Sequence, residues 1–423
     1  MQRRQFLRST ALAALSMSAL SYRRVLGAND RIQLGIIGAG NRGQALWQDF
    51  LSQADVAPVA VCDVYEPYRA KAVEMAGGAT PSYGDFRRLL DRPEVNAVIV
   101  ATPDHWHALP TIAACQAGKD VYVEKPLALK IHEGQLMLEA ARKHNRVVQT
   151  GSQQRSGAHY ARAVELVRSG ALGQVSHVSA GFVRNAMPGF GAHRVTAPPA
   201  GLDWDFWLGP APYRESLPLT PLYHFRNFWD YSGGQMTNFG AHDLDIVRWA
   251  MNVRGPQAVA GFGRRYALND GGETPDVQEV IYQFPDFVLN WSVREMNGAK
   301  EKMILEFHGT KGTLSVTRQG FELKPEVWTQ SEDPQAPRGQ EIVDPGSEQG
   351  LAHIRNFLDC VKSRARPNAD IEEGHRTAAL CHLGNIATRT GKQLRWDADN
   401  ERLIGDDAPT SWLSYAYRTP WAL

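Results

Sequence analysis

Apolar runs recur at regular intervals over the first third of the chain, and each is followed by a stretch with helical spacing. Continuous apolar runs of this length are typical of strands that are buried on both faces. A helix is predicted over Gln44–Ser52, and further helices separate the later strands. The repeating strand–helix order predicts a doubly wound parallel sheet. The predicted strands are Arg31–Gly38, Val56–Asp63, Val95–Ala101, Asp120–Val123 and Arg146–Gln149.

The pattern changes after residue 150. Apolar and polar residues alternate over 255–293 and 303–316, which predicts strands of an antiparallel sheet with a hairpin turn at Asp286-Phe287. Residues 330–347 are rich in Pro, Asp, Glu and Gly, which predicts a surface loop. Two amphipathic helices are predicted near the end of the chain. They cover Gly350–Ser363 and Glu372–Thr390.

The length and composition limit the class of protein. A chain of 423 residues is too long for one ordinary core and fits two domains. A formal net charge of +1 argues against a nucleic-acid or membrane-surface partner, which usually requires a basic bias. No two cysteines have Cys-x-x-Cys spacing, so no metal or redox site is predicted. Cys62 and Cys115 are expected to be buried thiols, and a disulfide between Cys360 and Cys381 stays open.

The first residues have the features of an export signal. Arg3-Arg4 precede Phe6-Leu7, and an apolar stretch covers 11–20. Twin arginines in this context resemble a Tat signal, and the stretch is too short and too rich in Ala and Ser for a stable membrane span. An arbitrary basic N-terminus would not explain why these features occur together. We expect a signal peptide over 1–28, a first domain over 29–150 and a second over 151–423, in a periplasmic or otherwise exported protein.

A glycine-rich loop follows the first predicted strand. Gly38-x-Gly40-x-x-Gly43 stands between a strand and a helix, which is the context that a dinucleotide-binding loop requires. The glycines permit a tight turn, a close approach of the backbone to a pyrophosphate, and helix–strand packing. Helix N-terminal amides, with Asn41 and Arg42 beside them, would face the phosphates.

Asp63 ends the second predicted strand, about twenty residues beyond the loop. A carboxylate there binds the ribose hydroxyls of the adenosine and repels a 2′-phosphate, which favours NAD over NADP. NADP stays possible, since Arg42 can pair with a phosphate. Asp63 could instead be a helix cap or a loop acid.

Polar residues follow two later strands of the same predicted sheet. Ligands of open parallel sheets lie beyond the carboxyl ends of the strands, so we expect these residues at the cofactor crevice. His105, Trp106 and His107 are expected to wall the nicotinamide pocket. The predicted cofactor contacts at these strand ends are Thr102, Pro103, Trp106, His107, Glu124 and Lys125.

The glycine loop, Ala101-Thr-Pro-Asp-His-Trp-His107 and Glu124-Lys-Pro126 together resemble the Gfo/Idh/MocA oxidoreductase family. Gly151–Ser156, Asp203–Pro210, Trp229–Gly234 and the tail from His353 are also similar, so the resemblance covers nearly all of the mature chain. It implies a Rossmann domain followed by an α/β domain with a large, mostly antiparallel open sheet. It also implies a sugar or polyol substrate between that sheet and the nicotinamide.

Oxidation of a secondary alcohol needs a hydride acceptor and a base for the hydroxyl proton. Lys125 is the candidate base, because a lysine in a partly dry cleft beside a cationic nicotinamide has a lowered pKa. Its alternative role is a surface ion pair with Glu124. A helix predicted over Met236–Met251 places Asn238 and His242 on one face.

The resemblance maps the family's acid/base histidine onto His242. Asp245, three residues further along, could orient its imidazole. Where the family more often has Asp, this chain has Asn238, which can hydrogen-bond a hydroxyl but cannot act as a base. This difference shifts the proton transfer onto Lys125 and His242.

Five further residues are predicted substrate contacts together with His242, each with an alternative role in loop packing or a surface ion pair. They are Arg155, Arg226, Trp229, Asp230 and Tyr231.

Three functions remain open. The leading one is an exported NAD-dependent sugar dehydrogenase or sugar–sugar oxidoreductase, a homo-oligomer that holds NAD tightly because free NAD is scarce outside the cytoplasm. A second is glycosidic bond cleavage through transient oxidation, with no net redox change. The intact Glu124-Lys125-Pro126 favours the dehydrogenase. A third, a non-catalytic NAD-bound protein, is disfavoured by the intact Lys125 and His242.

Overall fold

The computed structural model describes residues 31–190, 197–216, 224–296, 302–328 and 341–423. The predicted signal peptide lies outside the described residues, as does most of the loop predicted over 330–347. In the described part of that loop, Ile342–Pro345 forms a strand, β14. No helix among the described residues is long and apolar enough to cross a membrane.

The first domain is a six-stranded parallel sheet in the order β3-β2-β1-β4-β5-β6. The strand order reverses between β1 and β4, which opens a crevice at the carboxyl ends of these strands. The doubly wound fold is confirmed. Its strands are β1 Ile32–Ile37, β2 Val56–Cys62, β3 Ser82–Tyr83, β4 Ala97–Val100, β5 Asp120–Val123 and β6 Val148–Thr150, and its helices are α2 Asn41–Leu51, α3 Glu66–Met75, α4 Phe86–Leu90, α5 Ala108–Gln116 and α6 Ile131–Lys143.

The second domain is built on a ten-stranded sheet in the order β14-β13-β12-β11-β7-β10-β9-β8-β15-β16. Only the β7–β10 pair is parallel, so the large, mostly antiparallel sheet is confirmed. Burial alternates along β9 and β10, as in a sheet with one face on the core. The remaining strands are β7 Val175–Val183, β8 Ala258–Arg264, β9 Val277–Gln283, β10 Val288–Arg294, β11 Lys302–Gly309, β12 Gly312–Thr317, β13 Gly320–Pro325, β15 Leu394–Asp397 and β16 Arg402–Ile404.

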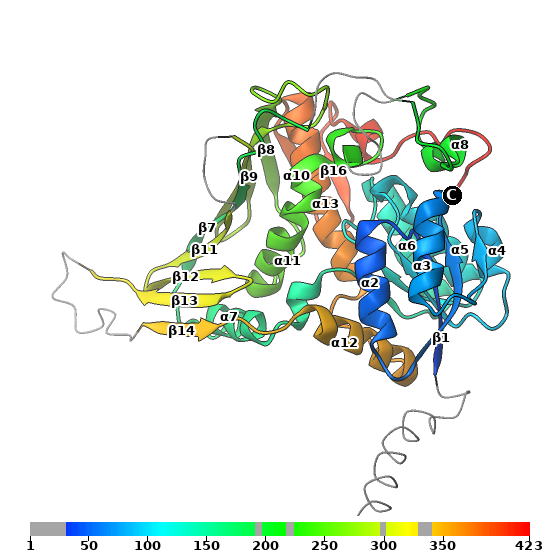
Figure 1. Ribbon diagram of the computed structural model, residues 1–423. Coiled ribbons are helices and arrows are strands. Elements are labelled where there is room, and N and C mark those ends of the chain that lie inside the picture. The colour runs from blue at the N-terminus through cyan, green and yellow to red at the C-terminus, as the bar shows by residue number, and fades with distance from the viewer. Residues whose placement is uncertain (1–30, 191–196, 217–223, 297–301, 329–340) are drawn as a thin grey trace, which may run out of the picture.

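The two sheets stand on either side of a layer of helices (Figure 1). This layer contains α10 Gly234–Asn238, α11 Gly240–Met251 and α13 Ile371–Thr390. The main core fills the space between these helices and the inner face of the large sheet, where Trp291 and Tyr282 are fully buried. The outer face of the sheet carries no helix of the described chain (Figure 1).

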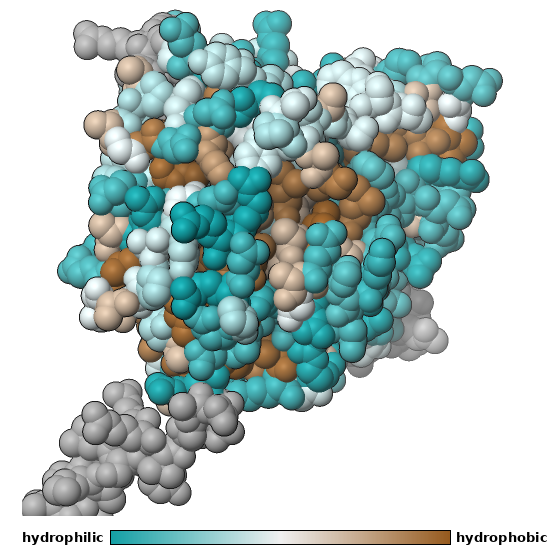
Figure 2. Space-filling model, turned by 90° about the vertical axis from the view of Figure 1, so that its right-hand side faces the viewer, coloured by the Kyte–Doolittle hydropathy of each residue, from teal (hydrophilic) through white to brown (hydrophobic). Residues whose placement is uncertain are grey.

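Helix α12, Gly350–Ser363, returns to the first domain. Its Phe357 packs edge-on against Phe50 of α2 and Tyr122 of β5, with ring centroids 6.0 and 5.8 Å apart. All three rings are buried in the core that the first parallel strands form with α2. Through Phe357, α12 is therefore part of the core of the first domain. Burial of one such side chain contributes about 1.5–3 kcal/mol to the free energy of folding. The outside of this domain is mostly hydrophilic, with narrower apolar areas between the polar side chains (Figure 2).

The prediction of a single helix over Met236–Met251 is wrong in one respect. The segment belongs to two helices that meet at Phe239. The ring of Phe239 stacks on Phe182 of β7 at 3.5 Å between centroids. The amide of His242 donates to the carbonyl of Phe239 at 2.9 Å, a three-residue spacing that tightens the turn. A Cβ at Gly240 would lie 3.2 Å from Met236 and Trp291, so the chain passes close to the core at this junction.

All four cysteines are buried and free, so the disulfide left open between Cys360 and Cys381 is absent. The remaining predicted elements lie close to their expected ranges. The hairpin at Asp286-Phe287 joins β9 to β10, and α12 has the predicted bounds.

Candidate functional site: a cavity between the two sheets

The glycine loop lies at the carboxyl end of β1. Gly38 has φ +89°, and a Cβ there would lie 2.6 Å from the backbone nitrogen of Thr102. A Cβ at Gly43 would lie 2.1 Å from the carbonyl oxygen of Gly38, so the third glycine permits the loop to fold back. Gly40 caps α2 without a side-chain hydrogen bond, which leaves the first amides of the helix for a ligand. This cradle fits the pyrophosphate of a dinucleotide.

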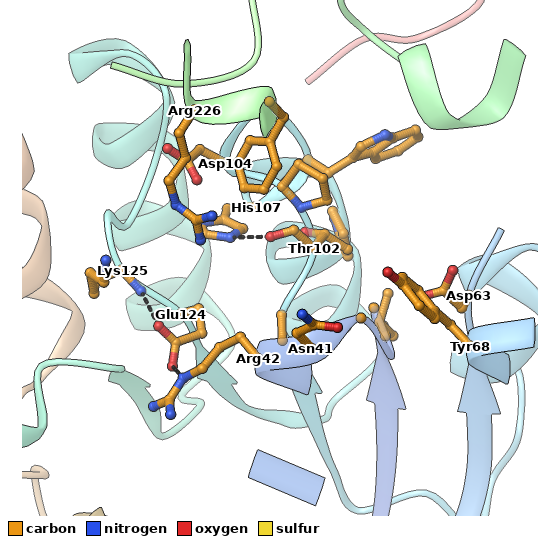
Figure 3. Close-up of a pocket in the computed structure, with 18 of the residues that line it drawn as sticks. Asn41, Arg42, Asp63, Tyr68, Thr102, Asp104, His107, Glu124, Lys125 and Arg226 are labelled. Atoms are coloured by element: carbon orange, nitrogen blue, oxygen red, sulfur yellow. Dashed lines mark hydrogen bonds and ion pairs between the residues drawn. The ribbon is translucent and has the colours of Figure 1, made fainter. Parts of the chain in front are cut away.

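Asp63 closes the loop from the end of β2. Its carboxylate accepts the amide of Ala39 at 2.6 Å and that of Tyr65 at 2.8 Å. Burial, partly offset by these amides, raises the pKa of Asp63 to about 6. Asp63 and Tyr68 line the cavity together with Asn41 (Figure 3).

The segment after β4 forms one wall of the same cavity, and Thr102, Pro103, Trp106 and His107 all line it. The ring nitrogens of His107 lie 2.7 Å from the carbonyl oxygen of Pro126 and 2.9 Å from that of Thr102. The indole of Trp106 donates to the carbonyl of Trp207 at 2.9 Å. Backbone contacts hold both rings, which makes them walls of the pocket.

Glu124 ends β5 and pairs with Arg42 of the glycine loop at 2.8 Å (Figure 3). Burial raises the pKa of the Glu124 carboxyl, but Arg42 and Lys125 outweigh it and hold the pKa below its ordinary value. A Cβ at Gly151 would lie 2.8 Å from the same carboxylate. This pair, of which only the Glu124 side is buried, holds the end of β5 against the glycine loop.

Lys125 reaches from β5 to the second domain. Its Nζ donates to Oδ1 of Asn238 at 2.8 Å and to the backbone oxygen of Asn238 at 2.9 Å. The Asn238 amide group donates in turn to Gln235 at 3.0 Å. Burial and the charge of Arg226 lower the pKa of Lys125 to about 8. A lysine with this pKa can hold or release a proton near neutral pH.

His242, on the first turn of α11, is buried and lines the cavity with Lys125. Burial and the nearby charge of Lys125 hold the pKa of His242 well below its ordinary value, so the ring is neutral at pH 7. Its Nδ1 is buried, and no hydrogen-bond partner for it lies among the described residues. An unpartnered buried nitrogen in a cavity wall is an available contact for a ligand.

Asp245 does not orient His242, contrary to the expectation from their spacing. One carboxylate oxygen accepts Nε of Arg155 at 2.7 Å, and the other accepts the hydroxyl of Thr377 at 2.9 Å. Arg155 also pairs with Glu373 at 3.0 Å. The side chain of Asp245 therefore faces α13, and it forms a buried ion pair with Arg155 that joins the linker to α11.

The predicted substrate contacts separate into two groups. Arg226 lines the cavity and extends toward Lys125 (Figure 3). The other four have partners elsewhere and are absent from the cavity wall. Arg155 is in the ion pair with Asp245, the ring of Trp229 lies 4.3 Å from the guanidinium of Arg389, Asp230 pairs with Arg214, and Tyr231 is buried against His105 and Trp207.

Two family models match this chain. One, described as an oxidoreductase family with an NAD-binding Rossmann fold, matches residues 32–152. The other, the C-terminal alpha/beta domain of the same family, matches residues 163–259 and 337–423. The chain belongs to the Gfo/Idh/MocA oxidoreductase family.

Individual relatives agree with this membership. The chain is 25% identical over 383 residues to a myo-inositol 2-dehydrogenase of Thermotoga maritima, covering 88% of this chain and 100% of that protein. It is 30% identical over 198 residues to a glycosyl hydrolase family 109 protein of Stenotrophomonas maltophilia, covering 43% and 42% of the two chains.

Solved structures share the fold. The WlbA dehydrogenase of Bordetella pertussis, in complex with NADH and UDP-GlcNAcA, superposes with a TM-score of 0.66 at 19% identity over 87% of this chain and 99% of that chain. The aldose-aldose oxidoreductase of Caulobacter crescentus, complexed with glycerol, has a TM-score of 0.66 at 20% identity over 86% and 99%.

In this oxidoreductase, the cavity of about 430 Å³ also contains residues that the sequence did not single out. They come from a short helix, α8 Trp204–Leu208, from a 3₁₀ turn at Phe225–Asn227, from the junction of α10 and α11, and from the β12–β13 turn, among other segments. No local signal marks them, because loops distant in sequence bring them together. The unpredicted lining residues include Phe206, Trp207, Phe225, Phe239 and Arg318.

No three side chains of His, Cys, Asp or Glu form a metal-binding group within the described chain.

Proposed function

We propose that this protein transfers a hydride between tightly held NAD and a secondary alcohol of a sugar or sugar-like substrate. The single observation that carries the proposal is the position of Lys125, which lines the same cavity as the glycine loop and His242 and donates from Nζ to Asn238. The match to the myo-inositol 2-dehydrogenase supports a polyol or sugar as the substrate class.

When bound, NAD supplies the hydride acceptor or donor. Lys125 accepts the hydroxyl proton at Nζ during oxidation and returns it during reduction. Its lowered pKa, about 8, leaves part of the population neutral near pH 7. Asn238 holds Nζ in place without supplying a charge. His242, neutral and without a partner at Nδ1 in the described part of the chain, positions the substrate by a hydrogen bond.

NAD is proposed in preference to NADP. Asp63 is fixed at the adenosine side by two backbone amides, and a carboxylate there repels a 2′-phosphate. Arg42, the residue that could have favoured NADP by pairing with its phosphate, forms an ion pair with Glu124 instead.

We propose that the enzyme is exported and keeps its NAD through export. The leader over 1–28 motivates the export proposal. The packing around the cofactor side of the cavity supports slow exchange. Trp106 and Phe206 line the cavity and stack on each other at 5.3 Å, and Trp421 packs edge-on against both at 4.8 and 5.1 Å.

Redox-neutral cleavage of a glycosidic bond is the alternative. The similarity to the family 109 glycosyl hydrolase favours it, although the match covers only 42% of that relative. Asn238, in the position where the family more often has Asp, also sets this chain apart from the common dehydrogenase pattern. Both reactions begin with oxidised NAD, so the presence of NAD does not distinguish them. Cleavage of the glycosidic bond itself must therefore be measured.

The deciding experiment starts from the purified exported protein. Its cofactor is released in acid and identified, and the holoprotein is then mixed with polyols, aldoses and aryl glycosides while absorbance at the reduced-nicotinamide band is followed. Reduction of the bound NAD by a sugar alcohol without release of an aryl group supports the dehydrogenase. Release of the aryl group with no net change in NAD supports the alternative. A protein that binds neither NAD nor NADP contradicts both.

A homo-oligomer is also proposed, with a second copy on the outer face of the large sheet. Phe262 of β8 and Ile281 of β9 are 76% and 51% exposed there. Exposed apolar residues on an uncovered sheet face mark a contact surface.

A further inference from the structure

Two arginines in the cavity wall have no acidic partner among the described residues. Arg226 and Arg318 both line the cavity, and no ion pair within the described chain includes either side chain. The arginines elsewhere in this protein are mostly paired, as in Arg42–Glu124 and Arg155–Asp245. These two differ from the paired arginine of the cavity wall, Arg42, because they line the cavity without an ion pair within the described chain.

Arg226 belongs to the 3₁₀ turn Phe225–Asn227. Its guanidinium lies 4.5 Å from the ring of Phe225 and extends into the cavity toward Lys125 (Figure 3). Its charge is close enough to oppose protonation of Lys125. Two like charges at close range are unfavourable unless an anion lies near both.

Arg318 comes from the turn between β12 and β13 of the large sheet, in the same domain as Arg226. Its Nε is buried and has no hydrogen-bond partner among the described residues. Arg318 and His242 line the same cavity, and the charge of Arg318 contributes to the low pKa of His242. A buried guanidinium nitrogen without an acceptor costs free energy that a bound anion recovers.

The acids of the cavity wall have contacts other than Arg226 and Arg318 among the described residues. Glu124 takes Arg42. Asp63 accepts hydrogen bonds from the amides of Ala39 and Tyr65, and Asp104 accepts one from the hydroxyl of Ser232 at 2.6 Å. These acids keep their negative charges, and that of Asp104 acts on Lys125. The cavity wall nevertheless carries four basic side chains of Arg and Lys against three acidic ones, and a bound anion would balance the excess.

We propose that the substrate of this enzyme is an anionic sugar whose carboxylate or phosphate is bound by Arg226 and Arg318, with its reacting alcohol at Lys125. The inference rests on the proposed function and narrows its substrate class. Guanidinium groups suit this role because their planar donors match two oxygens of a carboxylate or phosphate at once.

The test compares three probes that share the glucose ring and differ at C6: glucose with a hydroxymethyl group, glucuronate with a carboxylate and glucose 6-phosphate with a phosphate ester. Steady-state kcat/KM and reduction of the bound NAD are measured for the holoenzyme and for Arg226→Met, Arg318→Met and the control Arg395→Met, an exposed residue of β15. We expect an anionic probe to exceed glucose by tenfold or more in kcat/KM. We expect each cavity variant to remove most of that preference, with about a 10- to 100-fold rise in KM, while Arg395→Met is unchanged. The two anionic probes distinguish a carboxylate from a phosphate.

Binding without turnover gives an independent readout. The holoprotein carrying Lys125→Met is titrated with each anionic probe by calorimetry, with and without Arg226→Met. Loss of binding together with unchanged NAD content supports the proposal. Loss of NAD instead assigns Arg226 to the cofactor phosphates and overturns it.

Folding of the variants is checked by thermal unfolding, and Arg318→Lys, which keeps the charge, should restore part of the preference. Equal or better use of glucose by the wild type overturns the anionic substrate but leaves the proposed function intact. If no sugar, charged or neutral, reduces the bound NAD, the proposed function itself fails.

Discussion

The ammonium group of Lys125 donates to the side-chain oxygen of Asn238 at 2.8 Å and to its backbone oxygen at 2.9 Å. The two residues are 113 positions apart, one at the end of β5 and the other at the end of α10. This contact joins the first domain to the second domain in the cavity where the reaction is proposed to occur. Because Asn238 is uncharged, it fixes the position of Nζ while favouring the protonated form less than a carboxylate would.

Replacement of Lys125 by Met should lower the rate of hydride transfer by about 10²–10⁴-fold, the usual contribution of a general acid or base. The bound NAD should remain, because the glycine loop and Asp63 hold it. Single-turnover reduction of bound NAD and acid release of the cofactor measure the two effects. Lys71→Met, on the exposed surface of α3, is the control. Full activity in Lys125→Met would exclude this residue as the base.

Replacement of Asn238 by Asp should shift alcohol oxidation to higher pH. The wild-type rate is expected to rise through about pH 8 as Nζ loses its proton. A carboxylate 2.8 Å from Nζ favours the charged ammonium, which raises the pKa of Lys125 and moves the rise upward. The pH dependence of kcat measures the shift. Asn96→Asp, just before the amino-terminal end of β4, should leave the profile unchanged. An unshifted profile in Asn238→Asp would mean that Lys125 does not set the pH dependence.

Replacement of Arg155 by Met should destabilise the protein by about 3–5 kcal/mol, because it leaves Asp245 buried without its partner. Substrate KM should change little, since Arg155 is absent from the cavity wall. Urea unfolding and steady-state kinetics test the two statements. Arg254→Met, which removes an exposed pair with Asp399, is the matched control. A raised KM with unchanged stability would make Arg155 a substrate contact after all.

Replacement of Trp421 by Ala should speed the loss of NAD by roughly two- to tenfold, the range that aromatic contacts of about 0.5–1.5 kcal/mol provide. The ring packs against Trp106 and Phe206, which line the cavity. NAD remaining after timed gel filtration gives the rate. Trp328→Ala, beside the far end of the large sheet, should retain NAD like the wild type. Equal retention in both variants would remove Trp421 from cofactor retention.

Replacement of Phe262 by Glu should reduce the oligomeric state. The side chain is 76% exposed on the outer face of the large sheet, and a charge there would be buried between two copies. Light scattering coupled to gel filtration measures the mass. Val327→Glu, equally exposed beyond β13, is the control. A wild-type monomer would contradict the proposed contact.

The sequence predicts most of the fold because its signals are local. Apolar runs mark β1, β2, β4 and β5, and the spacing of glycines marks the loop before α2. The junction at Phe239 was missed because it depends on the stacking of that ring on Phe182, 57 positions earlier in the chain. Helical spacing alone cannot detect such a contact.

The same limit applies to the candidate site. Residues at strand ends could be assigned to the cavity because parallel strands place their carboxyl ends together. The pairing of Asp245 with Arg155 could not be predicted, since 90 positions separate them. Arg318 carries no motif, and only the packing of the β12–β13 turn near α11 brings its charge to His242.

The return of α12 to the first domain has a consequence for synthesis of the protein. Trp47, Phe50 and Tyr122 share their core with Phe357, which a ribosome adds more than two hundred residues after β6. At roughly 5–20 residues per second, the nascent Rossmann sheet waits on the order of 10–40 s with an apolar surface uncovered. Complete burial of this sheet, and with it a rigid glycine loop, comes late in translation. The newly made chain should therefore depend on chaperones in that interval and bind NAD firmly only afterwards.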